Sequence, residues 1–409
     1  MKPPFFRSSV LMVCLAVMAF CLPALAQAAT LTVPAQYPTI QAAINASANG
    51  DTVLIADGTY TGDGNRDIDF GGKNITATSQ NGSAKTIIDC GGSSSANHRG
   101  FYLHGGETQA VISGLTIENG FTSSVSGVAD SGFGGGICLD GSAATIRNCV
   151  VTKNVAQLSS GGIHNENNSY NFSNGTTNII GCLVMDNSAQ EGSSGGIGNS
   201  SNNYSGKGAV TTITNCTVAG NTAFYNGGGI TSSDTNAGTI TLTDCLITGN
   251  TSQNGSGGGV YNMNANSGGT ITLVKCTVTN NVSSNGTNLS DGGGVYNLNS
   301  NANQNAIYSG SVSTSKISLI ECIISGNNAR NGSGGGVDNY NYYGGTIALT
   351  RCKIVGNFTD TNGGGVLSEN GGSGGLTILT NCIVTGNNAG NGQGGASATL
   401  PITTSTATA

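Results

Sequence analysis

Residues 239–262 read TITLTDCLITGNTSQNGSGGGVYN, and the same pattern recurs along most of the chain. An alternating segment leads to a Cys, a Val or Ile stands two residues later, and an Asn stands five residues later. A polar loop, a run of Gly and an aliphatic residue complete the unit. The eight cysteines are Cys149, Cys182, Cys216, Cys245, Cys276, Cys322, Cys352 and Cys382. The eight asparagines are Asn154, Asn187, Asn221, Asn250, Asn281, Asn327, Asn357 and Asn387. Such self-similarity, at a period of about thirty residues, predicts stacked repeat units.

Odd and even spacings between residues within one unit predict where the chain turns. Alternate residues of a strand face the same side, so Ile240 and Leu242 share one face. Cys245 and Ile247 share the next, and the odd spacing between the two pairs predicts a bend near Asp244. A third short strand after the Gly run completes one coil of three strands.

Stacked coils would align equivalent residues in columns, because parallel strands lie about 4.8 Å apart. We therefore expect interior ladders of Cys, of Val or Ile, and of Asn. The Asn side chains would pair backbone groups at a bend where those groups otherwise lack partners. Eight repeat coils and three or four earlier ones predict an all-β solenoid of roughly 11–12 coils.

The composition of the 409-residue chain excludes several other classes of protein. It has 67 Gly but no Gly-X-Y period and only six Pro, which excludes collagen. Gly, Asn, Ser and Thr dominate where a helical protein would carry Ala, Leu, Glu and Lys. Only 8% of the residues are charged, so high net charge does not mark the chain as disordered.

Residues 1–29 have the features of a secretory signal peptide. Lys2 and Arg7 precede an apolar stretch over residues 10–25, and small residues offer cleavage after Ala26 or Ala28. We expect a secreted, extracellular or cell-envelope protein, including the outer-membrane surface, with no transmembrane segment in the mature chain. The rest of the chain carries 12 Lys and Arg against 20 Asp and Glu without a basic cluster, so we expect no nucleic-acid partner.

The mature chain divides into three segments. Residues 30–120 are expected to form the first coils, with a short amphipathic helix near residues 37–45 that caps the open end. Residues 121–395 hold the eight repeats, and residues 396–409 are a tail rich in Ser, Thr and Ala.

The N-terminal segment also resembles a known family. Residues 32–62, TVPAQYPTIQAAINASANGDTVLIADGTYTG, resemble the entry of pectin-lyase-like right-handed parallel β-helix proteins. The later units, with their Gly run and NCxVxGN signature, are similar to the repeats of polymorphic outer membrane proteins. The resemblance implies a right-handed parallel β-helix. It leaves the activity open, because this fold carries enzymes as well as adhesins.

Catalysis on such a fold needs clustered charged groups, and the acidic residues of the repeats fall singly. The richest cluster is N-terminal. Arg66, Asp67 and Asp69 are the candidate catalytic residues there, and Asp63, Asn65 and Asp67 are candidate calcium ligands. The calcium motif lacks the Gly and Glu of an EF-hand, so a polar turn is the alternative interpretation.

Three other groups of residues bear on function. For the cysteine ladder we expect buried free thiols rather than disulfides or metal ligands. His164 is expected at the surface. Aromatic residues of the longer segments could bind a sugar or a partner, with plain solvated turns as the alternative. These are Tyr170, Phe172, Tyr204, Tyr308, Tyr340, Tyr342 and Tyr343.

The sequence thus favours a non-catalytic binding, adhesive or structural protein without a cofactor, whose partner is a polysaccharide or a surface. The alternative is a polysaccharide lyase or hydrolase that acts on an acidic polysaccharide, with calcium as a possible cofactor. The oligomeric state is not predicted.

Overall fold

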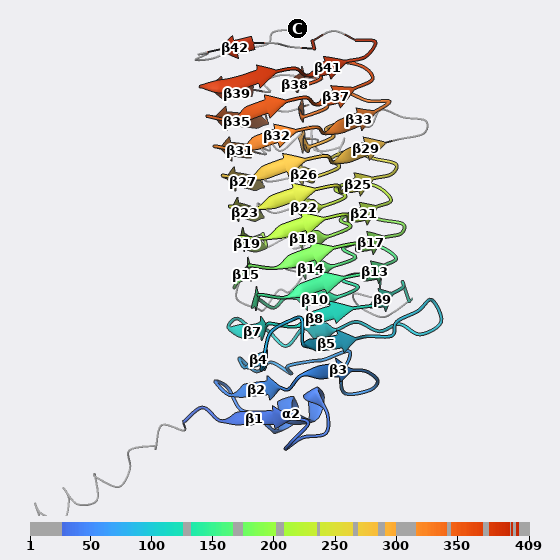
Figure 1. Ribbon diagram of the computed structural model, residues 1–409, viewed down its shortest axis with the longest axis vertical. Coiled ribbons are helices and arrows are strands. Elements are labelled where there is room, and N and C mark those ends of the chain that lie inside the picture. Colours follow the sequence, from blue (N-terminus) through green and yellow to red (C-terminus); the bar gives the residue numbers. More distant parts are fainter. Residues whose placement is uncertain are drawn as a thin grey trace, which may run out of the picture.

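The chain is an all-β right-handed parallel β-helix, as predicted (Figure 1). The computed structural model describes residues 27–125, 132–166, 175–201, 208–234, 238–264, 269–284, 291–299, 316–341, 345–370, 376–392, 394–395 and 398–400. Four sheets run along the column, and we number them I to IV in the order in which each repeat coil meets them. The predicted signal peptide and most of the predicted tail lie outside the described residues.

Sheets I and II hold the strands before and after the ladder cysteine. Sheet I contains β1 (Thr30–Val33), β2 (Thr52–Ile55), β4 (Thr76–Ser79), β7 (Ala110–Ser113), β11 (Ala144–Arg147), β15 (Thr176–Ile180), β19 (Val210–Thr214), β23 (Thr239–Thr243), β27 (Thr270–Val274), β31 (Lys316–Ile320), β35 (Thr346–Thr350) and β39 (Leu376–Thr380). Sheet II contains β3 (Gly58–Tyr60), β5 (Thr86–Asp89), β8 (Thr116–Glu118), β12 (Val150–Thr152), β16 (Leu183–Met185), β20 (Thr217–Ala219), β24 (Leu246–Thr248), β28 (Thr277–Thr279), β32 (Ile323–Ser325), β36 (Lys353–Val355), β40 (Cys382–Thr385) and β42 (Ala398–Leu400).

Sheets III and IV hold the strands after the ladder asparagine and after the Gly run. Sheet III contains β9 (Phe121–Thr122), β13 (Val155–Ala156), β17 (Ser188–Ala189), β21 (Thr222–Ala223), β25 (Thr251–Ser252), β29 (Val282–Ser284), β33 (Asn328–Arg330), β37 (Phe358–Thr359) and β41 (Asn388–Ala389). Sheet IV contains β6 (Phe101–Leu103), β10 (Ile137–Asp140), β14 (Ile163–Glu166), β18 (Ile197–Ser201), β22 (Ile230–Asp234), β26 (Val260–Asn264), β30 (Val295–Asn299), β34 (Val337–Asn341) and β38 (Val366–Asn370).

The prediction of three strands per coil is wrong, because a full coil has four. The strands of sheet III, such as β25, directly follow the ladder asparagine and are only two or three residues long. Such a strand shows no alternation in the sequence that could reveal it. Sheets I and II have twelve strands, and sheets III and IV have nine, so about nine turns are completed through the two shorter sheets. Among the described strands, all pairs are parallel except the pair of β40 and β42, and β42 lies within the predicted tail.

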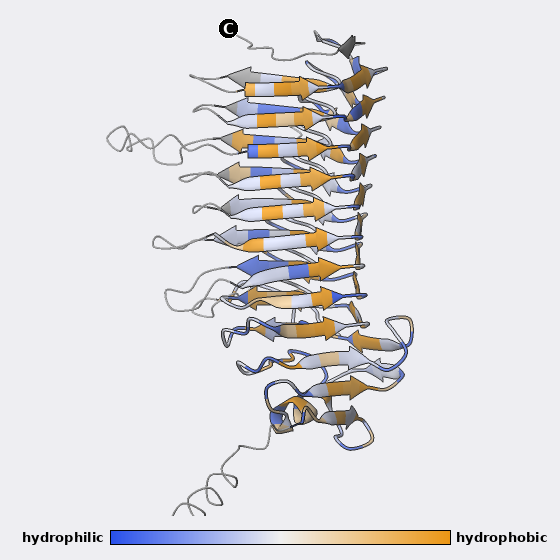
Figure 2. Cartoon of the chain, turned by 90° about the vertical axis from the view of Figure 1, so that its left-hand side faces the viewer, coloured by the Kyte–Doolittle hydropathy of each residue, from blue (hydrophilic) through white to orange (hydrophobic). Residues whose placement is uncertain are grey.

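The interior of the column is apolar. Ile240, Leu242, Ile247 and Val260 of one coil are all 0% exposed, and their register partners form continuous columns through the stack. Figure 2 shows the hydrophobic residues recurring at the same place in successive strands. A single coil cannot bury this face, so neighbouring coils stabilise one another.

Each repeat coil has at least three residues in the left-handed conformation, and two of them form the corners beside the ladder residues. Asp244, directly before the ladder cysteine, has φ +53°, which confirms the bend predicted there. Gly249, directly before the ladder asparagine, has φ +64°. Left-handed backbone costs a residue with a Cβ about 1–2 kcal/mol, so these corners favour Gly, Asn and Asp and need compensation from elsewhere in the coil.

The buried asparagines supply that compensation. Asn250 is 0% exposed and accepts hydrogen bonds at its Oδ1 from both the backbone N and the Nδ2 of Asn221, each at 3.0 Å. Its own Nδ2 donates to the carbonyl of Val218 and to Oδ1 of Asn281, both at 2.9 Å. The side-chain oxygen and both amide hydrogens are thus used, and each asparagine fixes the register of the coils beside it.

The Gly run owes its composition to this column of amides. A Cβ on Gly259 would lie 2.6 Å from the carbonyl oxygen of Gly294 and 3.0 Å from Nδ2 of Asn281. Both distances are shorter than van der Waals contact allows. The chain therefore passes the asparagine column only where it has no side chain.

The ladder cysteines, Cys90 and Cys138 are all buried, and in the described part of the chain they form no disulfide. The thiol of Cys245 donates to the carbonyl oxygens of Thr243 at 3.2 Å and Ile213 at 3.4 Å, so it closes the corner that precedes it. A small side chain that is both apolar and a weak donor suits this position.

A short helix, α2 (Ile40–Ala46), lies beside β1 at the N-terminal end of the column (Figure 1). The Thr39 hydroxyl caps it by accepting from the backbone N of Ala42, and Ile40 and Ile44 are buried. Among the described residues, no helix is long and apolar enough to cross a membrane.

Replacement of one ladder amide tests how much the column stabilises the stack. Asn250→Ala removes the four hydrogen bonds that this side chain makes with Val218, Asn221 and Asn281 in the interior. We expect a loss of about 3–5 kcal/mol in the free energy of unfolding, measured by denaturant titration. Asn178→Ala, on the outer face of sheet I, should change it by less than about 1 kcal/mol. Equal losses would contradict the role assigned to the column.

The thiols predict a pH dependence of stability. Burial raises the pKa of Cys90, and the hydrogen bond with Cys149 raises the pKa of Cys182 to about 12. Because the folded-state pKa lies above the unfolded value, this stabilisation is complete below about pH 9 and is lost as the pH rises toward about 12. The thermal unfolding midpoint should therefore fall as the pH is raised across this range.

Thiol labelling tests the burial of the cysteines directly. At about pH 8, a thiol reagent should label Cys90 and the eight ladder thiols only after denaturation. Rapid labelling of the native protein would contradict the burial.

Candidate functional site

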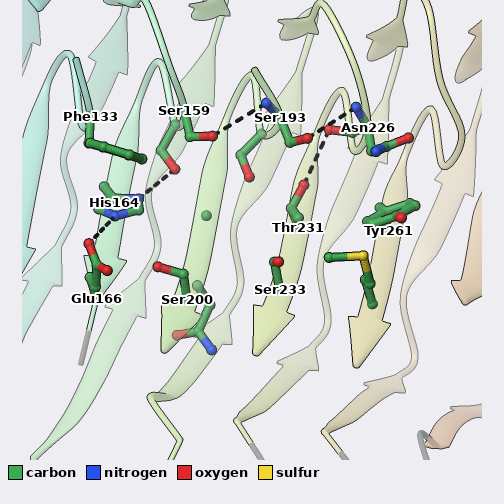
Figure 3. A pocket seen from close by; sticks show the side chains of 15 residues that line it. Phe133, Ser159, His164, Glu166, Ser193, Ser200, Asn226, Thr231, Ser233 and Tyr261 are labelled. Atoms are coloured by element: carbon green, nitrogen blue, oxygen red, sulfur yellow. Dashed lines mark hydrogen bonds and ion pairs between the residues drawn. The ribbon is translucent and has the colours of Figure 1, made fainter. Parts of the chain in front are cut away.

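A pocket of about 220 Å³ opens on the outer face of sheet IV (Figure 3). Register pairs His164 of β14 with Gly198 of β18, and then with Thr231 of β22 and Tyr261 of β26. These residues form one outward row across four coils. The segments that lead into sheet IV supply the facing wall, including Ser159 and Ser193.

The pocket lies where Gly198 interrupts this row of side chains. His164 lies on one side of it and Thr231 on the other, with Tyr261 beyond (Figure 3). A Cβ at position 198 would lie 2.0 Å from Oγ of Ser160, so the glycine also makes room for that hydroxyl. One residue without a side chain therefore creates the concave site.

A chain of three buried polar side chains closes one end of the pocket. Oγ of Ser160 lies 2.8 Å from Nδ1 of His164, and Nε2 of His164 lies 3.2 Å from Oε2 of Glu166. The Phe133 ring covers the imidazole at 5.0 Å between ring centroids. The order of hydroxyl, imidazole and carboxylate is that of a serine nucleophile with its base. Ser160 is 0% exposed, however, so a substrate carbon does not reach its oxygen, and the chain instead holds the imidazole in place.

Several polar groups face the pocket without a partner among the described residues. The hydroxyls of Ser194, Ser200 and Ser233 make no hydrogen bond there, nor does Nδ2 of Asn226. The Tyr261 hydroxyl is likewise available, and burial raises its pKa, so it stays protonated and can donate. Polar groups that converge on a pocket and lack protein partners are suited to hydrogen bonding with a ligand.

The expectation that His164 lies at the surface is wrong. It is 2% exposed, although it occupies an outward position of its strand. The turn that carries Ser160 folds over this position, and Phe133 covers it from the preceding coil. Sequence parity distinguishes inward from outward positions but cannot show that a turn covers the outward one. The signal for the pocket was Gly198, a glycine in a slot that other coils fill with side chains.

The predicted N-terminal residues form a separate cluster on the same side of the column. Arg66 contacts Asp63 at 3.1 Å and donates to the carbonyl of Cys90. The carboxylate of Asp67 lies 2.6 Å from Nδ1 of His98 and accepts from the backbone N of Arg99 at 2.8 Å. Asp67 has φ +51°, so this carboxylate also stabilises a left-handed turn.

Asp69 faces a second histidine of the cluster. Its Oδ2 lies 3.4 Å from Nε2 of His104, whose ring stacks on Tyr102. Tyr102 is two register steps from His164 along sheet IV, by way of Cys138. The structure thus pairs each of the two candidate catalytic acids with a different histidine, outside the pocket.

The candidate calcium ligands have other partners. Asn65 accepts at its Oδ1 from the backbone N of Ile40, at the start of α2, while Asp63 and Asp67 turn to Arg66 and His98. Among the described residues, no group of three or more His, Cys, Asp or Glu side chains is arranged to hold a metal ion. Calcium binding here remains a prediction from the sequence.

The aromatic residues of the longer segments are mostly outside the described part of the chain. Tyr340 lies in β34, where it pairs in register with Leu298 of β30. Outside the described residues lie Tyr170, Phe172, Tyr204, Tyr308, Tyr342 and Tyr343.

The fold is a parallel β-helix, the fold that the resemblance of residues 32–62 implied. Among solved structures, the chain is similar to pectate lyase Pel9A, with a TM-score of 0.46 and 15% identity over 82% of this chain and 72% of that one. It is also similar to the pectin methylesterase from Aspergillus niger in two deglycosylated forms, with TM-scores of 0.38 and 0.37 and 15% identity over 85% of this chain and 86% of the esterase. At this identity and these TM-scores, the likeness says nothing about the activity of this chain. No protein-family model and no curated protein matches the sequence. The relation of the repeats to those of polymorphic outer membrane proteins stays a prediction.

The contacts of Asp67 predict a structural effect of its removal. Asp67→Ala loses both the pairing with His98 and the bond from the Arg99 backbone, and it places alanine in a left-handed turn. We expect a loss of about 1–2 kcal/mol in the free energy of unfolding, because the site is partly exposed. Asp69→Ala gives up the contact with His104 and the hydrogen bond from the backbone N of Gly71, but it places no alanine in a left-handed turn, so it should cost less than about 1 kcal/mol. An Asp67→Ala protein of unchanged stability would favour the catalytic interpretation of this cluster.

Proposed function

We propose that this protein is an exported, non-catalytic β-helix that binds a polysaccharide, with one sugar residue held in the Gly198 pocket. The supporting observation is the convergence of unpartnered hydroxyl and amide groups from three coils around one concave site. Sugar hydroxyls donate and accept equally, and they match serine, tyrosine and asparagine groups of the same kind. Export is inferred from the signal-peptide pattern of residues 1–29.

Binding fits this lining better than glycoside cleavage does. The two common geometries of glycoside hydrolysis both need a pair of carboxyl groups that flank the scissile bond. The described lining residues supply one, Glu166, which is 4% exposed and lies against His164. The candidate acids of the N-terminal cluster lie outside the pocket. We therefore assign recognition, rather than turnover, to this site.

A pocket-filling substitution tests the proposal. Ser233→Tyr would project a ring into the pocket from β22, whereas Ser318→Tyr makes the same change on the outer face of sheet I. We would screen a panel of immobilised polysaccharides with the chain from residue 30 onward and measure affinity for those retained. We expect Ser233→Tyr to weaken binding at least about tenfold, or about 1.4 kcal/mol, and Ser318→Tyr to leave it within about twofold. Retention of no polysaccharide, or equal binding by both variants, would overturn the proposal.

A further inference from the structure

The charge and size of the Gly198 pocket bear on which kind of sugar enters it. We infer that the pocket selects an uncharged sugar residue and rejects a uronate. This inference rests on the proposed function, since it names the ligand class of the same site.

Among the described residues, the lining offers a ligand carboxylate no Lys or Arg as a partner. The fifteen described residues that line the pocket include no Lys or Arg. Proteins bind carboxylates tightly through guanidinium or ammonium groups, or through a bridging calcium ion. A uronate that entered this pocket would exchange its hydration for hydroxyl contacts alone, and that exchange is costly for a charged group.

One carboxylate among the described lining residues adds a second obstacle. Glu166 is 4% exposed, and its Oε2 lies 3.2 Å from Nε2 of His164 at the end of the pocket. A uronate in the pocket would bring a second carboxylate near this one, and like charges repel strongly in a medium of low dielectric constant.

The pocket suits an uncharged sugar in size and in hydrogen bonding. Its volume of about 220 Å³ is below the roughly 300–1,000 Å³ of pockets that enclose drug-sized molecules, so it holds a single ring rather than an oligosaccharide. Ser200, Asn226 and Ser233 are half-buried, while Tyr261 and Ser194 are buried. A sugar ring with hydroxyls on several sides can form hydrogen bonds with all of these lining groups without burying a charge.

Matched sugars that differ only in charge provide the test. We would titrate galactose against galacturonate and glucose against glucuronate by calorimetry or NMR, and confirm the site with Ser233→Tyr. We expect the uronate of the bound pair to bind at least about tenfold more weakly than the parent sugar. A uronate that binds as tightly as its parent, while both are blocked by Ser233→Tyr, would overturn the inference and leave the proposed function standing. Binding of neither sugar nor any polysaccharide would overturn both.

Two sets of variants separate charge from shape. Glu166→Gln keeps an oxygen that can accept from His164 but removes the carboxylate, so it should narrow the difference in affinity between the sugar and the uronate. Ser233→Lys should raise affinity for the uronate, and Ser233→Met, of similar length without charge, should not. A difference that neither Glu166→Gln nor Ser233→Lys changes would show that charge does not set the selectivity. The Lys and Met pair keeps this test valid if Glu166→Gln fails to fold.

Discussion

The structure depends on pairing the backbone at the corner between sheets II and III. A coil of parallel strands cannot turn inside a stack without removing some N–H and C=O groups from the sheet ladders, and buried groups of this kind are costly when unpaired. The asparagine column meets that need in eight successive coils, with one side chain serving two neighbours. The Gly run is needed because the chain passes close to these amides, and the left-handed corners turn the chain toward them.

This register also determines how the surface is built. Each outward position becomes one member of a row that runs through all coils, so a change in one coil alters the surface at a single point. Gly198 is such a change: its neighbours His164, Thr231 and Tyr261 carry side chains, and the gap between them is the pocket. A site can therefore form on this scaffold without any change in the backbone path.

Much of the architecture can be predicted from the alternation of residues in the sequence, and the features that this alternation missed have physical reasons. The odd spacing between Leu242 and Cys245 predicted the bend that Asp244 makes with its positive φ. The two-residue strand β25 was missed because two residues cannot show a period. The burial of His164 was missed because it depends on the turn that carries Ser160, which local alternation does not describe. The candidate acids Asp67 and Asp69 were found by composition, but their pairing with His98 and His104 needed the fold.

The scarcity of charge in this chain is consistent with recognition by hydroxyl groups. Only 8% of its residues are charged, and in the N-terminal cluster the acidic groups are paired with nearby histidine or arginine. An exported protein that bound an anionic polymer would need cations along its contact face. The Gly198 pocket instead presents hydroxyls, an amide and aromatic rings, and these groups can exchange hydrogen bonds with water for hydrogen bonds with a sugar at little cost. The feature that makes the column stable, neutral polar side chains that satisfy one another across coils, is therefore also the chemistry that its pocket offers to a ligand.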